Sequence, residues 1–123
     1  MHIHYFKSSA KNASEDRDLT QSFLNGFSKG VADYNSAMIA KDGGEDGVNA
    51  MVDLIHKYVY VDRPREKAAP SIINGTMRIA KGAALNVGSI QDQLSWFQSE
   101  GLVDADITMD QLVDPSYVTT TGA

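Results

Sequence analysis

One long apolar stripe limits what this chain can fold into more than any other feature of its sequence. From Asp16 to about Ala40, apolar side chains recur every three or four residues, which is the spacing of one face of an α-helix. The stripe consists of Leu19, Phe23, Phe27, Val31, Tyr34 and Met38. It predicts a helix that must bury one whole face against the rest of the protein.

Two glycines, Gly26 and Gly30, lie beside this stripe. Each glycine weakens a helix by about 1 kcal/mol relative to alanine. We expect a closely packed helix or strand next to them, because such a neighbour would explain two glycines within a helix. Gly43 and Gly44 then end the helix.

Two further helices are predicted by the same spacing. The first covers about residues 45–58, and its buried stripe is expected to be Val48, Met51, Val52, Ile55 and Val59. The second begins near Ser89, where Ser89 and Asp92 form a pair like a capping box, and it ends at Gly101. Ile90, Leu94 and Phe97 fall on one face of this helix, with Trp96 beside it.

The N-terminal residues predict one strand and one cap. Residues 2–6 alternate weakly and favour a short strand or an extended lead-in. Residues 8–14 are polar and predict a loop, after which Ser14 is expected to cap the long helix.

The remaining segments predict short helices and loops. A helical turn is expected around residues 64–69, closed by Pro70, and residues 71–87 predict a loop with short extended pieces. Thr108 and Gln111 predict a capped short helix. The chain is therefore expected to be mainly α, with three main helices, several short ones and one weak N-terminal strand. Its 123 residues are expected to form a single unit.

The composition excludes several classes of function. The net charge of −5 and the absence of a basic stripe make nucleic acid an unlikely partner by electrostatics. The chain has no cysteine, which excludes thiol catalysis, disulfides and thiolate metal sites. No apolar run is long enough for a membrane span, and the first residues do not have the pattern of a signal peptide.

Candidate chemical residues are few, and for each an ordinary structural role is favoured. His2 and His4 could share a metal ion on one face of a strand, but an exposed terminus is the favoured interpretation. His56 lacks a nucleophile and an orienting acid at any recognisable spacing, which favours a residue on a helix surface.

Two other groups of side chains could bind ligands. The carboxylates of Asp104, Asp106, Asp110 and Asp114 do not have the spacing of a calcium loop, which favours solvated, capped turns. The rings of Tyr34, Trp96 and Phe97 could stack on a ligand, but aromatic residues at helical spacing favour a hydrophobic core. We therefore predict no catalytic residue, no metal site and no cofactor, and we assign no ligand-binding residue.

Two stretches resemble one protein family. Residues 23–37 read FLNGFSKGVADYNSA, and residues 88–118 contain GSIQDQLSWF, then GLV, then MDQLVD and YV. Both resemble segments of the periplasmic solute-binding proteins of ABC importers for nitrate, sulfonates, taurine and thiamin-pyrimidine precursors. The resemblance covers nearly the whole chain, with one clear departure: Ala32 stands where the family often has arginine. Any contact made by that arginine is in doubt here.

The resemblance implies a fold and a function. Members of this family are two-lobed α/β proteins that close around a small polar solute and deliver it to a membrane permease. This chain would be the C-terminal portion of one lobe, located in the periplasm, with most of the cleft formed by upstream sequence. A branch of the same superfamily makes the thiamin pyrimidine, but it carries a cysteine-rich motif and an active-site histidine, so an enzyme is disfavoured.

One alternative comes from the apolar stripes themselves. Amphipathic helices without a sheet to cover could pair with a second copy of the chain. The chain would then be a free-standing helical module for interaction or oligomerisation, without a ligand.

Overall fold

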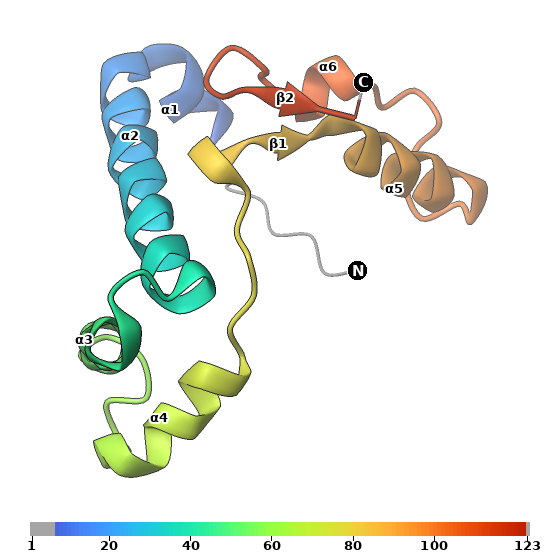
Figure 1. The fold of residues 1–123 in the computed structure, drawn as a ribbon. Helices are drawn as coiled ribbons and strands as arrows, with labels where there is room; N and C mark the ends of the chain where they lie inside the picture. Colours follow the sequence, from blue (N-terminus) through green and yellow to red (C-terminus); the bar gives the residue numbers. More distant parts are fainter. Residues whose placement is uncertain (1–6, 123) are drawn as a thin grey trace. The chain divides into compact units, whose positions relative to one another are not determined.

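The computed structural model describes residues 7–122, and these are mainly helical (Figure 1). They form two compact units, one from the described parts of Met1–Ser28 and Gly82–Ala123, and the other from Lys29–Lys81. Each unit is described separately below. The strand predicted at residues 2–6 lies outside the described residues. The expectation that residues 1–123 act as a single unit stays a prediction.

The helix α2 (Arg17–Tyr34) is the long helix predicted from the apolar stripe. A π-helix continues it over Asn35–Ala40, and Lys41 ends it in the left-handed conformation, with φ of 57°. The prediction of a helix over residues 16–40 is therefore confirmed. The burial prediction is only partly right. Val31 and Met38 are buried, but Leu19, Phe23 and Phe27 are exposed, and the neighbouring Thr20 and Leu24 are buried instead.

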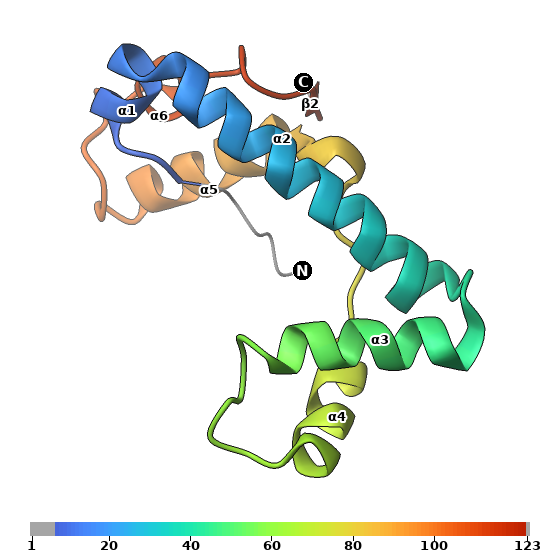
Figure 2. The same ribbon diagram turned by 90° about the vertical axis from the view of Figure 1, so that its left-hand side faces the viewer.

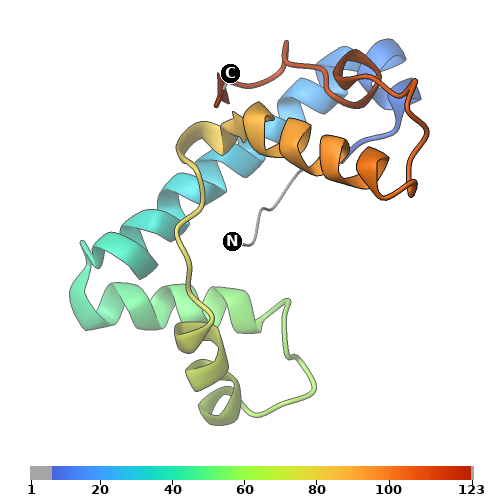
Figure 3. The ribbon, with the colours of Figure 1, turned by 90° about the vertical axis from the view of Figure 1, so that its right-hand side faces the viewer.

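The unit of Lys29–Lys81 has a small hydrophobic core. The helix α3 (Gly44–His56) packs against α4 (Arg65–Asn74), and the two helices lie side by side in Figures 2 and 3. The core consists of Met38, Val52, Ala68 and Ile72, with Tyr34, Val48, Met51 and Ile55 packed around it. Val48, Val52 and Ile55 lie on one face of α3, which confirms most of the predicted stripe. Val59 is exposed, because α3 ends before it.

Asn35 holds residues 76–80 through two hydrogen bonds to Ile79. Its side-chain nitrogen donates a hydrogen bond to the carbonyl oxygen of Ile79 (2.8 Å), and its side-chain oxygen accepts one from the Ile79 N–H (3.2 Å). The amide group thus pairs with both backbone polar groups of one residue, as a neighbouring strand would. Residues 76–80, which have no regular secondary structure, are held to the π-helix in this way.

The other unit contains a parallel pair of strands. The strand β1 (Leu85–Asn86) pairs with β2 (Thr120–Thr121), with Leu85 opposite Thr120. The helix α5 (Val87–Ser99) follows β1 directly and contacts β2, and α6 (Met109–Leu112) lies in the connection between the two strands (Figure 1). The order strand, helix, parallel strand is a βαβ unit. The compact unit that contains these strands has a small hydrophobic core. Among its described residues, the buried hydrophobic side chains are Leu24 and Leu94.

Several helix ends differ from those expected. Ser9 caps the short helix α1 (Ala10–Glu15), so Ser14 lies within that helix and residues 8–14 are not a loop. Asn86, not Ser89, caps α5, because its side-chain oxygen accepts the Ser89 N–H at 3.0 Å. That bond leaves no role for the expected pairing of Ser89 with Asp92.

Three other predicted ends and segments can be compared with the structure. Pro70 does not end α4 but lies inside it, so the predicted loop at residues 71–87 begins later than expected. The capping box of Thr108 with Gln111 is confirmed. Gly101 is also confirmed as a stop, with φ of 68°.

The expected close neighbour of Gly26 and Gly30 is not found among residues 7–122. A Cβ atom added to either glycine would have no atom within 4 Å of it, apart from the helix's own backbone and adjoining residues. We therefore expect Gly26→Ala and Gly30→Ala each to raise the free energy of unfolding of this chain by about 1 kcal/mol, through the higher helix propensity of alanine. Urea denaturation of the single variants checks this. Destabilisation by either alanine would show that another surface packs closely there.

Candidate functional site

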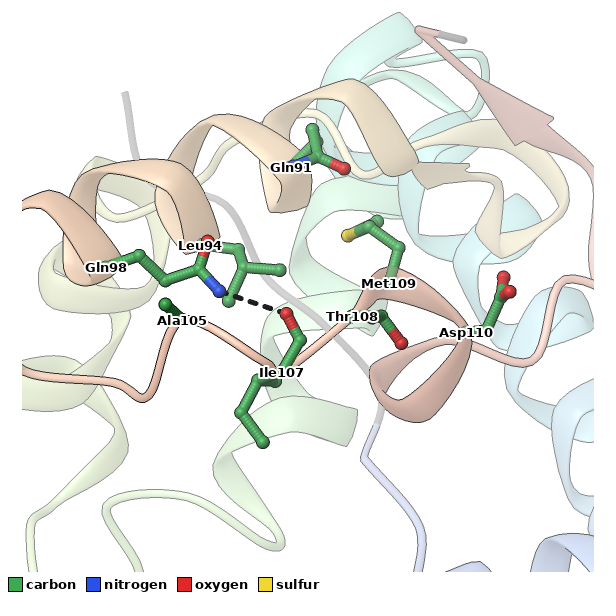
Figure 4. A pocket seen from close by; sticks show the side chains of 8 residues that line it. All are labelled: Gln91, Leu94, Gln98, Ala105, Ile107, Thr108, Met109 and Asp110. Carbon is green, nitrogen blue, oxygen red and sulfur yellow. Dashed lines mark hydrogen bonds between the residues drawn. The ribbon is translucent and has the colours of Figure 1, made fainter.

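A cavity of about 300 Å³ lies between α5 and the segment that leads to α6 (Figure 4). Gln91, Leu94 and Gln98 line it from α5, and Ala105, Ile107, Thr108, Met109 and Asp110 line it from the other side. Gln98 donates hydrogen bonds to the carbonyl oxygens of Asp104 (3.1 Å) and Ile107 (3.0 Å). Its amide nitrogen is therefore used to hold the loop, and it is not available to a ligand.

Two other polar groups of this cavity are also used by the fold. The Thr108 N–H donates to the side-chain oxygen of Gln111 (2.8 Å) in the capping box of α6, and Gln91 donates to Ser95 (3.3 Å). The one charged side chain in the lining is the carboxylate of Asp110. A solute with a sulfonate or nitrate group needs positive charge or free N–H donors, so this lining does not suit such an anion.

The most connected polar cluster is a tail clasp, formed by Arg17, Asp114, Ser116 and Tyr117. Arg17 donates to the hydroxyl oxygen of Ser116 (2.9 Å) and to its carbonyl oxygen (3.4 Å). The Arg17 guanidinium also lies 4.2 Å from the centre of the Tyr117 ring and 3.8 Å from a carboxylate oxygen of Asp114. One arginine at the start of α2 thus makes four contacts with the segment before β2.

Tyr117 strengthens the same connection. Its hydroxyl donates a hydrogen bond to the carbonyl oxygen of Ala13, and its own carbonyl oxygen accepts one from Gln21 (3.4 Å). Two residues further on, the Thr119 carbonyl accepts the Leu85 N–H (2.9 Å), and the pairing of β1 with β2 begins. The tail clasp therefore positions the strand that completes the βαβ unit.

Ser116 also lowers the pKa of the Asp114 carboxyl. Hydrogen bonds from the hydroxyl and the backbone N–H of Ser116 lower the pKa of the Asp114 carboxyl below its ordinary value of 3.8, with a smaller contribution from Arg17. Because the pKa is lowered in the folded state, the ionised carboxylate stabilises the clasp at neutral pH. That contribution is lost as the pH falls below 3.8 and through the folded-state pKa.

This dependence gives a direct prediction for Ser116. We expect Ser116→Ala to raise the pKa of Asp114 toward 3.8, because the variant lacks the stronger of the two hydrogen bonds to the carboxylate. Titration of the Asp114 carboxyl carbon by NMR measures the pKa in both proteins. An unchanged pKa in the variant would mean that the Ser116 hydroxyl does not bond to Asp114 in solution.

The structure does not bring the candidate residues of the sequence together. His56 donates a hydrogen bond from its Nε2–H to the carbonyl oxygen of Arg63 (2.8 Å), which is a structural contact. Among residues 7–122, no three histidine or acidic side chains lie close enough together to hold a metal ion. The acidic candidates Asp104, Asp106, Asp110 and Asp114 therefore do not form a metal site. His2 and His4 lie outside the described residues.

The aromatic candidates differ from the expectation of a core. Trp96 and Phe97 are exposed, with their rings edge to face and 5.1 Å apart, so the core interpretation was wrong for both. Tyr34 does pack against the core that contains Met38. None of the described helices has the length and apolar character that a membrane crossing requires. Comparison with protein-family models, with curated proteins and with solved structures finds no match for this chain.

Proposed function

We propose that this chain is the C-terminal portion of a solute-binding protein of an ABC importer, of the kind that carries nitrate, sulfonates, taurine or a thiamin-pyrimidine precursor. Its role is binding and delivery, without catalysis, in the periplasm. The proposal starts from the resemblance of residues 23–37 and 88–118 to that family. Three features of the structure support it.

The βαβ unit is the observation that carries the proposal. Parallel strands occur almost entirely in α/β proteins, in sheets that helices cover on both faces. Two strands of two residues each are too small to be stable alone, since independent sheets need at least three strands or a packed helix face. We infer that β1 and β2 belong to a larger parallel sheet, as expected for the α/β fold of periplasmic binding proteins.

The exposed side chains on α2 and α5 support the same inference. Leu19 and Phe27 on α2, and Trp96 on α5, are large, apolar and exposed. Helices beside a parallel sheet bury such faces against the sheet. The space beside Gly26 and Gly30 on α2 would let a strand or helix approach closely.

The order of elements within the second resembling stretch also fits. Residues 88–118 contain nearly all of α5, the stop at Gly101, the capped helix α6 and the clasp residues Asp114, Ser116 and Tyr117. The resemblance implies a helix, the residues Gly-Leu-Val, a Leu-Val-Asp turn and a short tail at the C-terminal end of the family, and the elements of this chain are compatible with that order. Ala32 is exposed on α2, so no contact of this side chain compensates for the arginine of the family.

Solute binding by the product of the complete reading frame tests the proposal. The purified product is heated in the presence of nitrate, taurine, a longer alkanesulfonate or an aminopyrimidine. A true solute at about 100 times its dissociation constant should stabilise the protein by about 2.7 kcal/mol, which raises the unfolding temperature. If no class of solute shifts this temperature and the product is a stable oligomer, the helical interaction module replaces the proposal.

A further inference from the structure

Residues 57–61, which connect α3 to the turn before α4, form an exposed loop of unusual composition. Four consecutive residues, Tyr58, Val59, Tyr60 and Val61, are exposed to 73%, 46%, 37% and 69% of their surfaces. Such a run of exposed apolar residues costs solubility and is not expected in a soluble protein unless it serves binding. We call residues 57–61 the tyrosine–valine loop.

Contacts with Arg63 hold the Tyr60 end of the loop. Tyr60 has a φ of 60°, which is rare for a bulky side chain and marks backbone strain. The Arg63 N–H donates to the Tyr60 carbonyl oxygen (2.9 Å), and His56 bonds to the Arg63 carbonyl oxygen (2.8 Å). The Arg63 guanidinium also lies 5.1 Å from the centre of the Tyr60 ring. A loop fixed in this way loses little conformational entropy when it binds.

The charges around the loop point to an anionic partner. Residues 57–67 contain four basic and two acidic side chains, although the whole chain has a net charge of −5. Lys57 lies at the base of the loop, with its ammonium 5.9 Å from the centre of the Tyr58 ring. Arg65 is paired with Asp53 and Asn49, but Lys57 and Lys67 form no ion pair with a described residue.

We propose that the tyrosine–valine loop docks on a membrane surface, with Tyr58, Val59 and Val61 among the headgroups of anionic phospholipids. Tyrosine is favoured at the membrane interface, because its ring is apolar and its hydroxyl remains hydrated. The Lys57 ammonium, at the base of the loop, would contact the lipid phosphates. A protein partner fits less well, since a stable protein interface takes 20 to 30 residues per side, roughly, and this loop has five. The proposal does not depend on solute binding.

Sedimentation with lipid vesicles tests this proposal. The full chain is mixed with vesicles of phosphatidylcholine, with or without an equal part of phosphatidylglycerol. We expect binding to the anionic vesicles alone, and its loss at about 1 M salt, where charges are screened beyond about 3 Å. Absence of binding to anionic vesicles at low salt would overturn the proposal, as would equal binding to both kinds of vesicle.

Matched variants separate the loop from other exposed apolar residues. Tyr58→Ser with Val61→Ser is expected to weaken binding by about tenfold or more, and Lys57→Gln by about fivefold. Leu54→Ser and Trp96→Ser are the controls, because both side chains are about half exposed, at 52% and 54%, outside the loop. If a control weakens binding as much as the loop variant, the loop is not the docking site.

A fluorescence measurement detects insertion of the loop directly, so the test does not depend on loss of binding in a variant that fails to fold. Trp96 is the one tryptophan of the chain, so Trp96→Phe with Tyr58→Trp places the only indole in the loop. Its emission should shift to shorter wavelength when anionic vesicles are added, because the indole leaves water. An emission that stays unchanged while the protein sediments with the vesicles would show that another surface binds.

Discussion

Replacing Val52 with aspartate is expected to unfold the unit formed by Lys29–Lys81. Val52 is 0% exposed and contacts the core residues Met38, Ala68 and Ile72. Among these apolar side chains an aspartate has no hydrogen-bond partner and no counter-charge. An unpaired buried charge costs roughly 3–5 kcal/mol, and a whole domain is stable by only about 5–15 kcal/mol. The variant should therefore lose the circular dichroism of α3 and α4.

The adjacent exposed position of α3 provides the control for this prediction. Leu54 lies on the same helix and is 52% exposed. Leu54→Asp adds the same side chain where water can solvate it, and it should lower the free energy of unfolding by only about 1 kcal/mol, because aspartate has a lower helix propensity and adds a negative charge in the last turn of α3. If both variants lose the same amount of helix, the packing of α3 on α4 does not stabilise this unit.

Replacing Tyr117 with alanine is expected to release the segment that leads to β2. The variant loses the ring that lies under Arg17, at 4.2 Å, and the hydroxyl that bonds to Ala13. Loss of a partly buried aromatic ring and its hydrogen bond should lower the free energy of unfolding by about 2–3 kcal/mol. Urea denaturation measures this loss. Amide exchange at Leu85, whose N–H bonds to Thr119, reports whether the strand pair opens.

Tyr117→Phe separates the ring from the hydroxyl. The phenylalanine keeps the ring and its contact with Arg17 but cannot donate to Ala13, so it should cost about 1 kcal/mol. Equal stability of the alanine and phenylalanine variants would contradict the role of the ring. Rapid Leu85 exchange in the unmodified protein would show that the tail clasp is open in solution.

Apolar spacing predicted the long elements of the fold well. The helices α2, α3 and α5 all lie where side chains recur every three or four residues. A helix with a buried face needs that spacing, so the signal is physical and local. The capping residues were harder to predict, because several side chains near a helix end can each accept a hydrogen bond from its backbone N–H groups. Asn86 and Ser9 are as able to cap as Ser89 and Ser14, and sequence alone did not distinguish them.

Packing between distant segments explains most of the remaining errors. Pro70 normally ends a helix, but Ala68 and Ile72 on either side of it are buried against Val52, and that burial stabilises α4 through the proline. The exposure of Leu19 and Phe27 was also not predictable, because the spacing of a stripe does not say what covers it.

The tail clasp could not be predicted from the sequence. Arg17 and Ser116 are 99 residues apart, and neither lies in a recognisable motif. The spacing of Asp114 with the acidic residues before it predicts solvated turns and does not point to Arg17. The parallel pairing of β1 with β2 was also missed, because two residues per strand give no detectable alternation. The pairing is nevertheless the feature that best supports an α/β protein.

The glycines of α2 connect the fold to the proposed function. In this chain alone, alanine at Gly26 or Gly30 meets open space and should stabilise the helix. In the product of the complete reading frame, a sheet packed on α2 would fill that space. The same substitutions should then destabilise the protein, because an added methyl group overpacks a close contact. A change of sign between the two proteins would support the larger sheet.

Small-angle X-ray scattering of the product of the complete reading frame tests the central claim most directly. A solute-binding protein closes its two lobes around its ligand, because the solute binds the closed state more tightly than the open one. We predict that the solute which raises the unfolding temperature also lowers the radius of gyration. A radius of gyration that every solute leaves unchanged would contradict the assignment of this chain to a solute-binding protein.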